Sequence, residues 1–139
     1  MKRTPISNPF TFETTKWLGH WLSGGKSVTY IPHSVRDELL PFHPDEPVIL
    51  YRSVTEDVEG NPSTLTFPFF TSWTYDLSMA ENFSEKSNRP IISAEIHPDD
   101  ILADTTMINP RVITKFMGGF PDEQEVIVSP GTYQVIWIP

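Results

Sequence analysis

Apolar residues recur at helical spacing near the start of the chain. Residues 8–25 carry four that fall on one side of a helix, namely Trp17, Leu18, Trp21 and Leu22. Asn8 is a candidate N-cap for this helix, and the Gly-Gly pair that follows it supplies the stop. A second, shorter helix is predicted to begin near Ser34, and it has to end before Pro41 because proline continues a helix poorly.

In the middle of the chain the apolar residues become consecutive, which is typical of buried strands. Residues 48–54 form one such run after a proline. Residues 65–74 form another, in which Pro68 indicates an edge strand or a bend because proline has no N–H to donate. From Asp76 the apolar spacing returns to three residues, so a helix capped by Asp76 or Ser78 is predicted to follow the strand directly.

The last third of the chain is mostly predicted strand. Residues 91–96 form one strand, and a Pro-Asp-Asp turn at 98–100 leads into an extended stretch. Residues 118–139 indicate a loop, a strand, a turn at Pro130-Gly131 and a final strand, which is a hairpin in outline. Helices early and strands late predict an α+β domain rather than a doubly wound parallel sheet.

Composition limits the size and the partners of this domain. A chain of 139 residues with 38% hydrophobic content fits one domain, 1–139, made of a helical part at 1–45 and a β core at 46–139. The formal net charge of -8 disfavours nucleic acid and anionic membranes as partners, because both bind surfaces rich in Lys and Arg. No apolar stretch has the length of a membrane span and none follows the basic start as in a signal peptide, so we expect a cytoplasmic protein.

Several common catalytic motifs are absent or incomplete. The chain has no cysteine, which excludes thiolate nucleophiles and Cys-type zinc sites. The stretch SGGKSV lacks the first glycine of a phosphate-binding loop and follows a predicted helix rather than a strand. The four histidines have no spacing typical of a metal site, and no serine lies in a G-x-S-x-G turn. We therefore expect no metal, and the informative residues are polar ones within the apolar strands.

Arg52 is the polar residue of the first predicted strand. A buried arginine is costly unless an anion pairs with it, and its planar guanidinium group suits a phosphate. The alternative is that Arg52 lies on the open face of an edge strand and pairs with a nearby Asp or Glu. The residue alone leaves both interpretations open.

Two glutamates, Glu123 and Glu125, stand two apart at the head of the run EQEVIV. Side chains two apart in an extended strand share a face at about 7 Å, so both carboxylates could address one ligand. Like charges that close would also raise one pKa, which suits a division between an electrostatic role and a proton-accepting role. The plainer interpretation is a solvated acidic strand start, which is common for isolated glutamates.

Three motifs occur in order along the chain: LYRS with Arg52, SWTYDLSMAENF with Ser72 and Thr74, and EQEVIVSPGTY with Glu123 and Glu125. Together they resemble the R-S-E class of ADP-ribosyltransferases, and the resemblance extends from residue 48 to residue 138. It implies an ADP-ribosyltransferase-like fold, in which two packed, mostly antiparallel sheets form an NAD cleft flanked by helices. Trp73 and Thr74 depart from the usual Ser-Thr-Ser motif of that class.

The resemblance also implies roles for these residues. Arg52 would bind a phosphate of NAD, and backbone groups near Ser53 would take the nicotinamide amide. Ser72 would hold Glu125, the catalytic residue, which stabilises oxocarbenium charge as the nicotinamide–ribose bond breaks. Glu123 would accept a proton from the incoming nucleophile.

Three further residues complete the implied NAD site. Thr74 replaces the second serine of the motif. Arg89 lies in NRPIISAEI, which is similar to the loop that binds the pyrophosphate. Phe83 would contact nicotinamide, although an Ala/Phe stripe on a helix is more often packing.

The implied function is a mono-ADP-ribosyltransferase that uses NAD to modify a protein. Arginine is the expected acceptor, because a glutamate at the first position of E-x-E accompanies arginine acceptors in that family. An NAD glycohydrolase with water as acceptor would use the same residues, and a catalytically silent binding module of the same fold is the third hypothesis. The small size indicates a phage-encoded modifier in the host cytoplasm or an intracellular toxin.

The segment preceding the two glutamates would recognise the target protein. It spans residues 115–122, beginning with Lys115 and ending with Asp122. Its glycine pair, Gly118 and Gly119, would supply mobility, and Phe120 would offer an exposed aromatic anchor.

Overall fold

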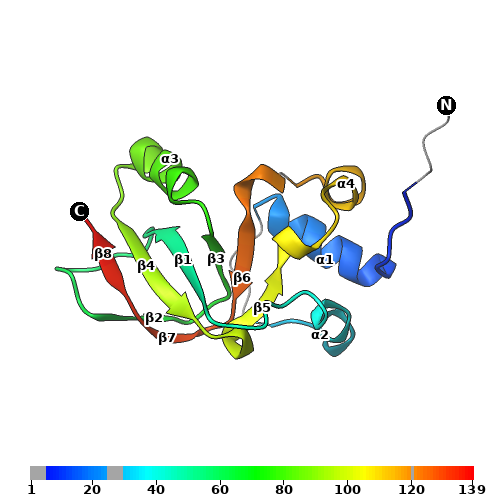
Figure 1. Cartoon of the computed structure of the whole chain (residues 1–139), viewed down its shortest axis with the longest axis horizontal. Helices are drawn as coiled ribbons and strands as arrows, with labels where there is room; N and C mark the ends of the chain where they lie inside the picture. Colours follow the sequence, from blue (N-terminus) through cyan, green and yellow to red (C-terminus); the bar gives the residue numbers. More distant parts are fainter. Residues whose placement is uncertain (1–5, 25–29, 120) are drawn as a thin grey trace.

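Figure 1 shows the chain as a computed structural model, which describes residues 6–24, 30–119 and 121–139. Within these residues the fold is α+β, with a mostly antiparallel arrangement of strands and a few helices. The larger sheet has six strands in the order β5-β6-β3-β1-β4-β8. In chain order these are β1 (Val48–Ser53), β3 (Thr71–Thr74), β4 (Ile91–Ile96), β5 (Ile101–Asp104), β6 (Glu125–Val128) and β8 (Ile136–Ile138).

A two-stranded ribbon and several helices complete the fold. The ribbon pairs β2 (Thr64–Phe67) with β7 (Gly131–Gln134). The α-helices are α1 (Phe12–Leu22), α2 (His33–Leu39), α3 (Leu77–Ser87) and α4 (Pro110–Val112). In Figure 1, α1, α2 and α4 lie on the side of β5 and β6, whereas α3 lies against β1, β3 and β4.

Two apolar clusters hold these layers together. The first joins the N-terminal helices to β5 and β6, and its buried members include Leu18, Trp21, Val35, Leu39, Leu102 and Ile127. The second lies between the large sheet and the ribbon, and it includes Leu50, Trp73, Ile92, Val126, Phe67 and Tyr133. In the second cluster the ring of Phe67 meets that of Trp73 edge-on, with 6.0 Å between centroids. The described part of the first 45 residues therefore shares a core with the strands.

The boundaries of the three predicted helices agree with the structure except at the start of the first one, whereas η2 (Thr105–Met107) and α4 begin in a stretch that was predicted to be extended. The N-cap of α1 is Thr11, whose side chain accepts from a backbone N–H of the first turn. Asn8 instead accepts from the backbone N–H of Phe10 at 3.0 Å, so it forms a turn before the helix. As predicted, α2 ends at Leu39 before the proline, and the side chain of Asp76 caps α3.

The predicted C-terminal hairpin is wrong. The strand β6 pairs with β3 and β5, and β7 crosses to the ribbon and pairs with β2. All four residues of β6 are buried, because both of its edges and both of its faces are already covered. The turn at Pro130-Gly131 therefore carries the chain from one sheet to the other. In the same way, the run at 65–74 is broken at Pro68 into β2 and β3, which belong to different sheets.

Candidate functional site

Three neighbouring strands, β6, β3 and β1, bring Arg52, Ser72 and Glu125 together. The strands β1 and β3 pair at one position, where Tyr51 lies opposite Thr74. Next to that position, the side chain of Arg52 also bonds to β3. Its Nη1 donates to the backbone carbonyl oxygen of Ser72 at 2.9 Å. The Ser72 hydroxyl in turn donates to Oε1 of Glu125 on β6.

Arg52 is mostly buried and already paired with a carboxylate. Its side chain is 14% exposed, and Nη2 lies 2.5 Å from Oε1 of Glu56. The guanidinium carbon also lies 5.5 Å from the centroid of the Phe67 ring, which is within the range of a cation–π contact. Arg52 is therefore not on the open face of an edge strand, but it does pair with a nearby glutamate, as the second interpretation expected.

Spare hydrogen-bonding groups remain at this end of β1. The Nε of Arg52 and the hydroxyl of Ser53 are buried, and neither has a hydrogen-bond partner among the described residues. Buried polar atoms without a partner are rare in folded proteins, because each forfeits its bonds to water. The two atoms therefore indicate a place where a polar ligand would be stabilised.

Glu125 is the first residue of β6 and is buried, with 4% of its surface exposed. This excludes the interpretation of a solvated strand start. A buried carboxylate is costly unless it accepts hydrogen bonds, and the Ser72 hydroxyl supplies one. At the backbone of the same residue, the hydroxyl of Thr105 donates to the Glu125 carbonyl oxygen at 2.6 Å.

The expectation that Glu123 and Glu125 share one extended strand is wrong. Glu123 ends a 3-10 turn, η4 (Pro121–Glu123), and Gln124 has a φ of 48°. A residue with that φ breaks the two-residue alternation, so the strand begins only at Glu125. In the sequence, Pro121 could have indicated this turn, because proline favours the first position of a helical turn. Glu123 itself is half-buried, and its carbonyl oxygen accepts from the Thr74 hydroxyl at 2.8 Å.

The three remaining residues predicted to contact NAD are not part of the group formed by Arg52, Ser72 and Glu125. Thr74 is buried, and its hydroxyl donates to the carbonyl oxygen of Glu123 and accepts from the backbone N–H of Asp76 at 3.1 Å. Arg89 is exposed in the loop after α3, directly before Pro90, whose carbonyl accepts from the backbone N–H of Val54 at 2.8 Å. Arg89 therefore lies near the end of β1 that carries Arg52. Phe83 is on α3, and its side chain lies outside the described part of the chain.

Sequence reasoning missed a hydrogen-bonded pair at the end of β5, formed by a half-buried tyrosine and a buried aspartate. The hydroxyl of Tyr75 donates to Oδ2 of Asp104 at 2.6 Å, and Asp104 is 3% exposed. Burial raises the pKa of Tyr75 well above its usual value, and the hydrogen bond to Asp104 and its charge raise it further. Asp104 also caps the next turn, since its Oδ1 accepts from the backbone N–H of Thr106. The Asp-Thr-Thr sequence after an apolar strand was a signal for that cap.

The segment predicted as a mobile recognition loop is largely helical. Lys115 belongs to a π-helix, η3 (Ile113–Met117), which packs against α1. Gly119 is buried, and a methyl group there would meet Ile113 Cγ2 at 2.9 Å, so this glycine serves close packing rather than mobility. Gly118 has a φ of 68° and ends the π-helix. Phe120 and the side chain of Asp122 lie outside the described residues.

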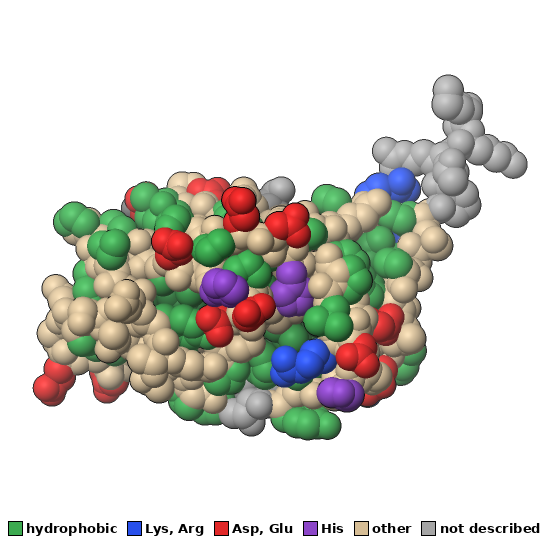
Figure 2. All heavy atoms as spheres, turned by 60° about the horizontal axis from the view of Figure 1, so that its bottom comes forward, with side chains coloured by type: hydrophobic (Ala, Val, Ile, Leu, Met, Phe, Trp, Pro, Cys, Tyr) green, Lys and Arg blue, Asp and Glu red, His purple; other side chains and the backbone are tan. Residues whose placement is uncertain are grey.

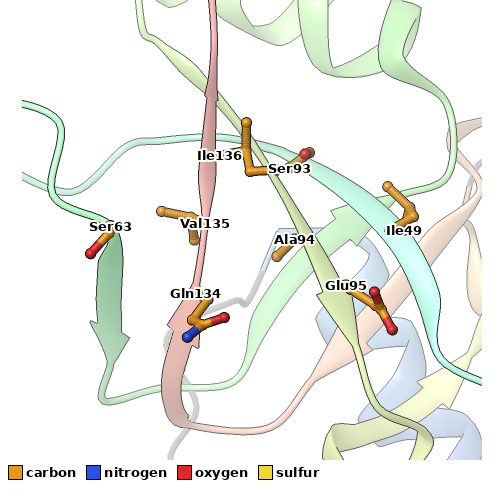
Figure 3. A pocket seen from close by; sticks show the side chains of 8 residues that line it. All are labelled: Ile49, Ser63, Ser93, Ala94, Glu95, Gln134, Val135 and Ile136. Atoms are coloured by element: carbon orange, nitrogen blue, oxygen red, sulfur yellow. The ribbon is translucent and has the colours of Figure 1, made fainter.

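Two surface hollows lie elsewhere. One, of about 400 Å³, opens where the chain leaves β7 for β8, and Figure 3 shows the side chains around it. Its lining includes Ile49, Ser93, Glu95 and Ile136, and none of the predicted site residues. The other, of about 310 Å³, lies beside α2 and is lined in part by Arg36, His43 and Asp99. Figure 2 shows a face on which acidic side chains and histidines are spread among apolar and uncharged groups.

Comparisons with protein-family models, with curated proteins and with solved structures found no match for this chain. Among residues 6–24, 30–119 and 121–139, no helix is long and apolar enough to cross a membrane. The same residues contain no group of three or more His, Asp or Glu that could hold a metal ion.

Proposed function

We propose that the chain is an NAD-dependent mono-ADP-ribosyltransferase that cleaves the nicotinamide–ribose bond and transfers ADP-ribose to a protein, with arginine as the acceptor. One observation carries the proposal. The Ser72 hydroxyl donates to the carboxylate of Glu125, and the guanidinium group of Arg52 donates to the carbonyl of the same serine. An arginine, a serine and a glutamate from three adjacent strands thus form one connected group, as the resemblance to the R-S-E class leads one to expect.

The chemistry needs a fixed negative charge beside the ribose. Breaking the bond to nicotinamide develops positive oxocarbenium character on the sugar, which a held carboxylate stabilises. Glu125 suits this task because the Ser72 hydroxyl holds one of its oxygens. Its burial also lowers the local dielectric constant, which strengthens the stabilisation of charge. Since the carboxylate is covered, the proposal requires that covering groups move when the ribose binds.

NAD fits the spare donors at the end of β1. The Nε of Arg52 suits a phosphate oxygen, and the Ser53 hydroxyl suits the carbonyl of the nicotinamide amide. Arg89, in the loop beside this end of the strand, would supply a second positive charge for the pyrophosphate. Holding both ends of the pyrophosphate would orient the bond that breaks.

A specific observation supports NAD glycohydrolase as the second candidate. Glu123 lies in the turn η4 rather than on β6, so it is not fixed on the same strand face as Glu125. Transfer to arginine requires a base that takes the proton of the acceptor, whereas water is a small nucleophile that needs less precise placement. The same group of Arg52, Ser72 and Glu125 would serve either reaction.

The test uses adenine-labelled NAD with the wild type, Glu125→Gln and a matched control, Glu95→Gln. Glu95 is an exposed strand glutamate of the same sheet, so its variant controls for the loss of a charge. We expect the wild type and Glu95→Gln to release nicotinamide and to label a discrete protein in a cell lysate, and Glu125→Gln to do neither. Release without labelled protein would favour the glycohydrolase. Equal release by Glu125→Gln and the wild type would refute both candidates.

A further inference from the structure

The residue directly before Glu125 has an unfavourable backbone conformation. Gln124 has a φ of 48°, in the left-handed region, and it joins the turn η4 to the first residue of β6. A residue other than glycine in that region costs roughly 1–2 kcal/mol, and it persists only where surrounding contacts hold it. Glu125 therefore has no preceding strand residue to fix its position.

Two buried threonine hydroxyls hold the backbone on either side of Gln124. Thr74, on β3, donates to the carbonyl oxygen of Glu123 at 2.8 Å. Thr105 begins η2 (Thr105–Met107), directly after β5, and donates to the carbonyl oxygen of Glu125 at 2.6 Å. The strands β3 and β5 are the two neighbours of β6, so the two hydroxyls come from opposite sides.

These threonines are suited to hold a position rigidly. They are 6% and 5% exposed, and their β-branched side chains have few rotamers available. The hydrogen bond to the carbonyl of Glu125 fixes the residue whose carboxylate is held by Ser72 at the other end. Glu125 is thereby constrained through its backbone as well as through its side chain.

We propose that Thr105, together with Thr74, is a positioning residue that sets the carboxylate of Glu125 against the ribose of NAD. This inference rests on the proposed function. Neither threonine touches the reacting atoms, and each acts through the backbone next to Gln124. Misplacement of a reacting group by 1 Å can cost about 100-fold in rate, so the loss of one hydroxyl would lower kcat much more than it changes KM for NAD.

The test compares Thr105→Val, which has nearly the same shape without the hydroxyl, with Thr105→Ser, which keeps the hydroxyl. Thr71→Val is the matched control. Thr71 is also 6% exposed, but its hydroxyl bonds to a side chain, because it accepts from Nε1 of Trp73 at 2.8 Å. Each variant is measured for nicotinamide release, for KM and for melting temperature.

We expect Thr105→Val to lose about 10- to 100-fold in kcat with little change in KM, as misplacement of a reacting group predicts. Thr105→Ser should restore most of the activity, and Thr71→Val should melt lower than the wild type while keeping its kcat. Thr74→Val, a second variant from the other side of Gln124, should resemble Thr105→Val. Equal kcat values for Thr105→Val and Thr71→Val would overturn the positioning role alone. A wild type that releases no nicotinamide would overturn the proposed function, and the positioning role with it.

Discussion

Replacing Glu56 by glutamine should raise the affinity of the chain for NAD. In the structure the Glu56 carboxylate lies against the guanidinium group that we propose binds a phosphate, at 2.5 Å from Nη2 of Arg52. Its other oxygen accepts from the backbone N–H of Thr55 at 3.1 Å, which keeps the carboxylate turned toward the arginine. A phosphate that takes Nη2 would therefore have to displace Glu56.

The size of the effect follows from the exposure of the pair. The side chains of Arg52 and Glu56 are 14% and 35% exposed, so the pair is accessible on the glutamate side. Ion pairs of this kind contribute about 0.2–1 kcal/mol. If that energy opposes NAD binding, then its removal lowers Kd by between about 1.4-fold and fivefold, because 1.4 kcal/mol corresponds to a factor of ten.

The assay is calorimetric titration of NAD into proteins that also carry Glu125→Gln, so that the NAD is not consumed. Glu59→Gln is the matched control, because Glu59 is an exposed glutamate of the same connection between β1 and β2. It removes the same charge from the same loop without touching Arg52. Tighter binding by Glu56→Gln than by Glu59→Gln is the expected result. Weaker binding by Glu56→Gln would refute the reasoning, since it would mean that Glu56 helps to hold Arg52 for the ligand.

Three further predictions concern the stability of the fold. Burial raises the pKa of Glu38, but hydrogen bonds from Thr11 and Thr14 outweigh it and hold that pKa below the usual 4.5. The stabilisation of the fold by the Glu38 carboxylate is therefore complete above about pH 4.5 and is lost as the pH falls through the lowered pKa. In urea unfolding, Glu38→Gln should lower the free energy of unfolding by about 0.5–1 kcal/mol at pH 7 and by much less near pH 3. Gly119→Ala should cost about 1–3 kcal/mol in thermal unfolding, because the methyl group would lie 2.9 Å from Ile113 Cγ2. Burial raises the pKa of Tyr133 to about 12, and the charge of Asp100 adds to the shift. The folded protein should therefore lose stability as the pH rises from 10 toward 12, and Tyr133→Phe should lose less over that range, as measured by urea unfolding.

Features set by neighbouring residues could be predicted from the sequence. Asp76 caps α3 because its carboxylate reaches the N–H groups of the turn that follows, a contact between residues two apart. The end of α2 before Pro41 and the break at Pro68 follow from the missing N–H and the fixed φ of proline. Each of these signals acts over a few positions, and the structure agrees with them.

Features set by distant residues could not be predicted. The strands β6 and β7 look like a hairpin because a Pro-Gly turn joins them, but β6 has its neighbours in β3 and β5. Pairing depends on which edges and faces remain open after the whole chain has folded, and a local pattern does not contain that information. Glu123 is a smaller example. Its spacing from Glu125 predicted that both residues lie on one strand, but the positive φ of Gln124 between them ends the strand at Glu125.

The pairing of Arg52 with Glu56 bears on how an acidic chain could bind an anionic dinucleotide. With a formal net charge of -8, the protein as a whole repels a pyrophosphate, so affinity has to come from a few placed cations. An unpaired, mostly buried guanidinium group would be expensive to maintain before the ligand arrives. Glu56 removes that cost in the free protein, and a phosphate that took Nη2 as well as Nε would exchange one anion for another instead of burying a new charge. A dinucleotide also carries a second phosphate, which would suit Arg89 in the loop beside this end of β1.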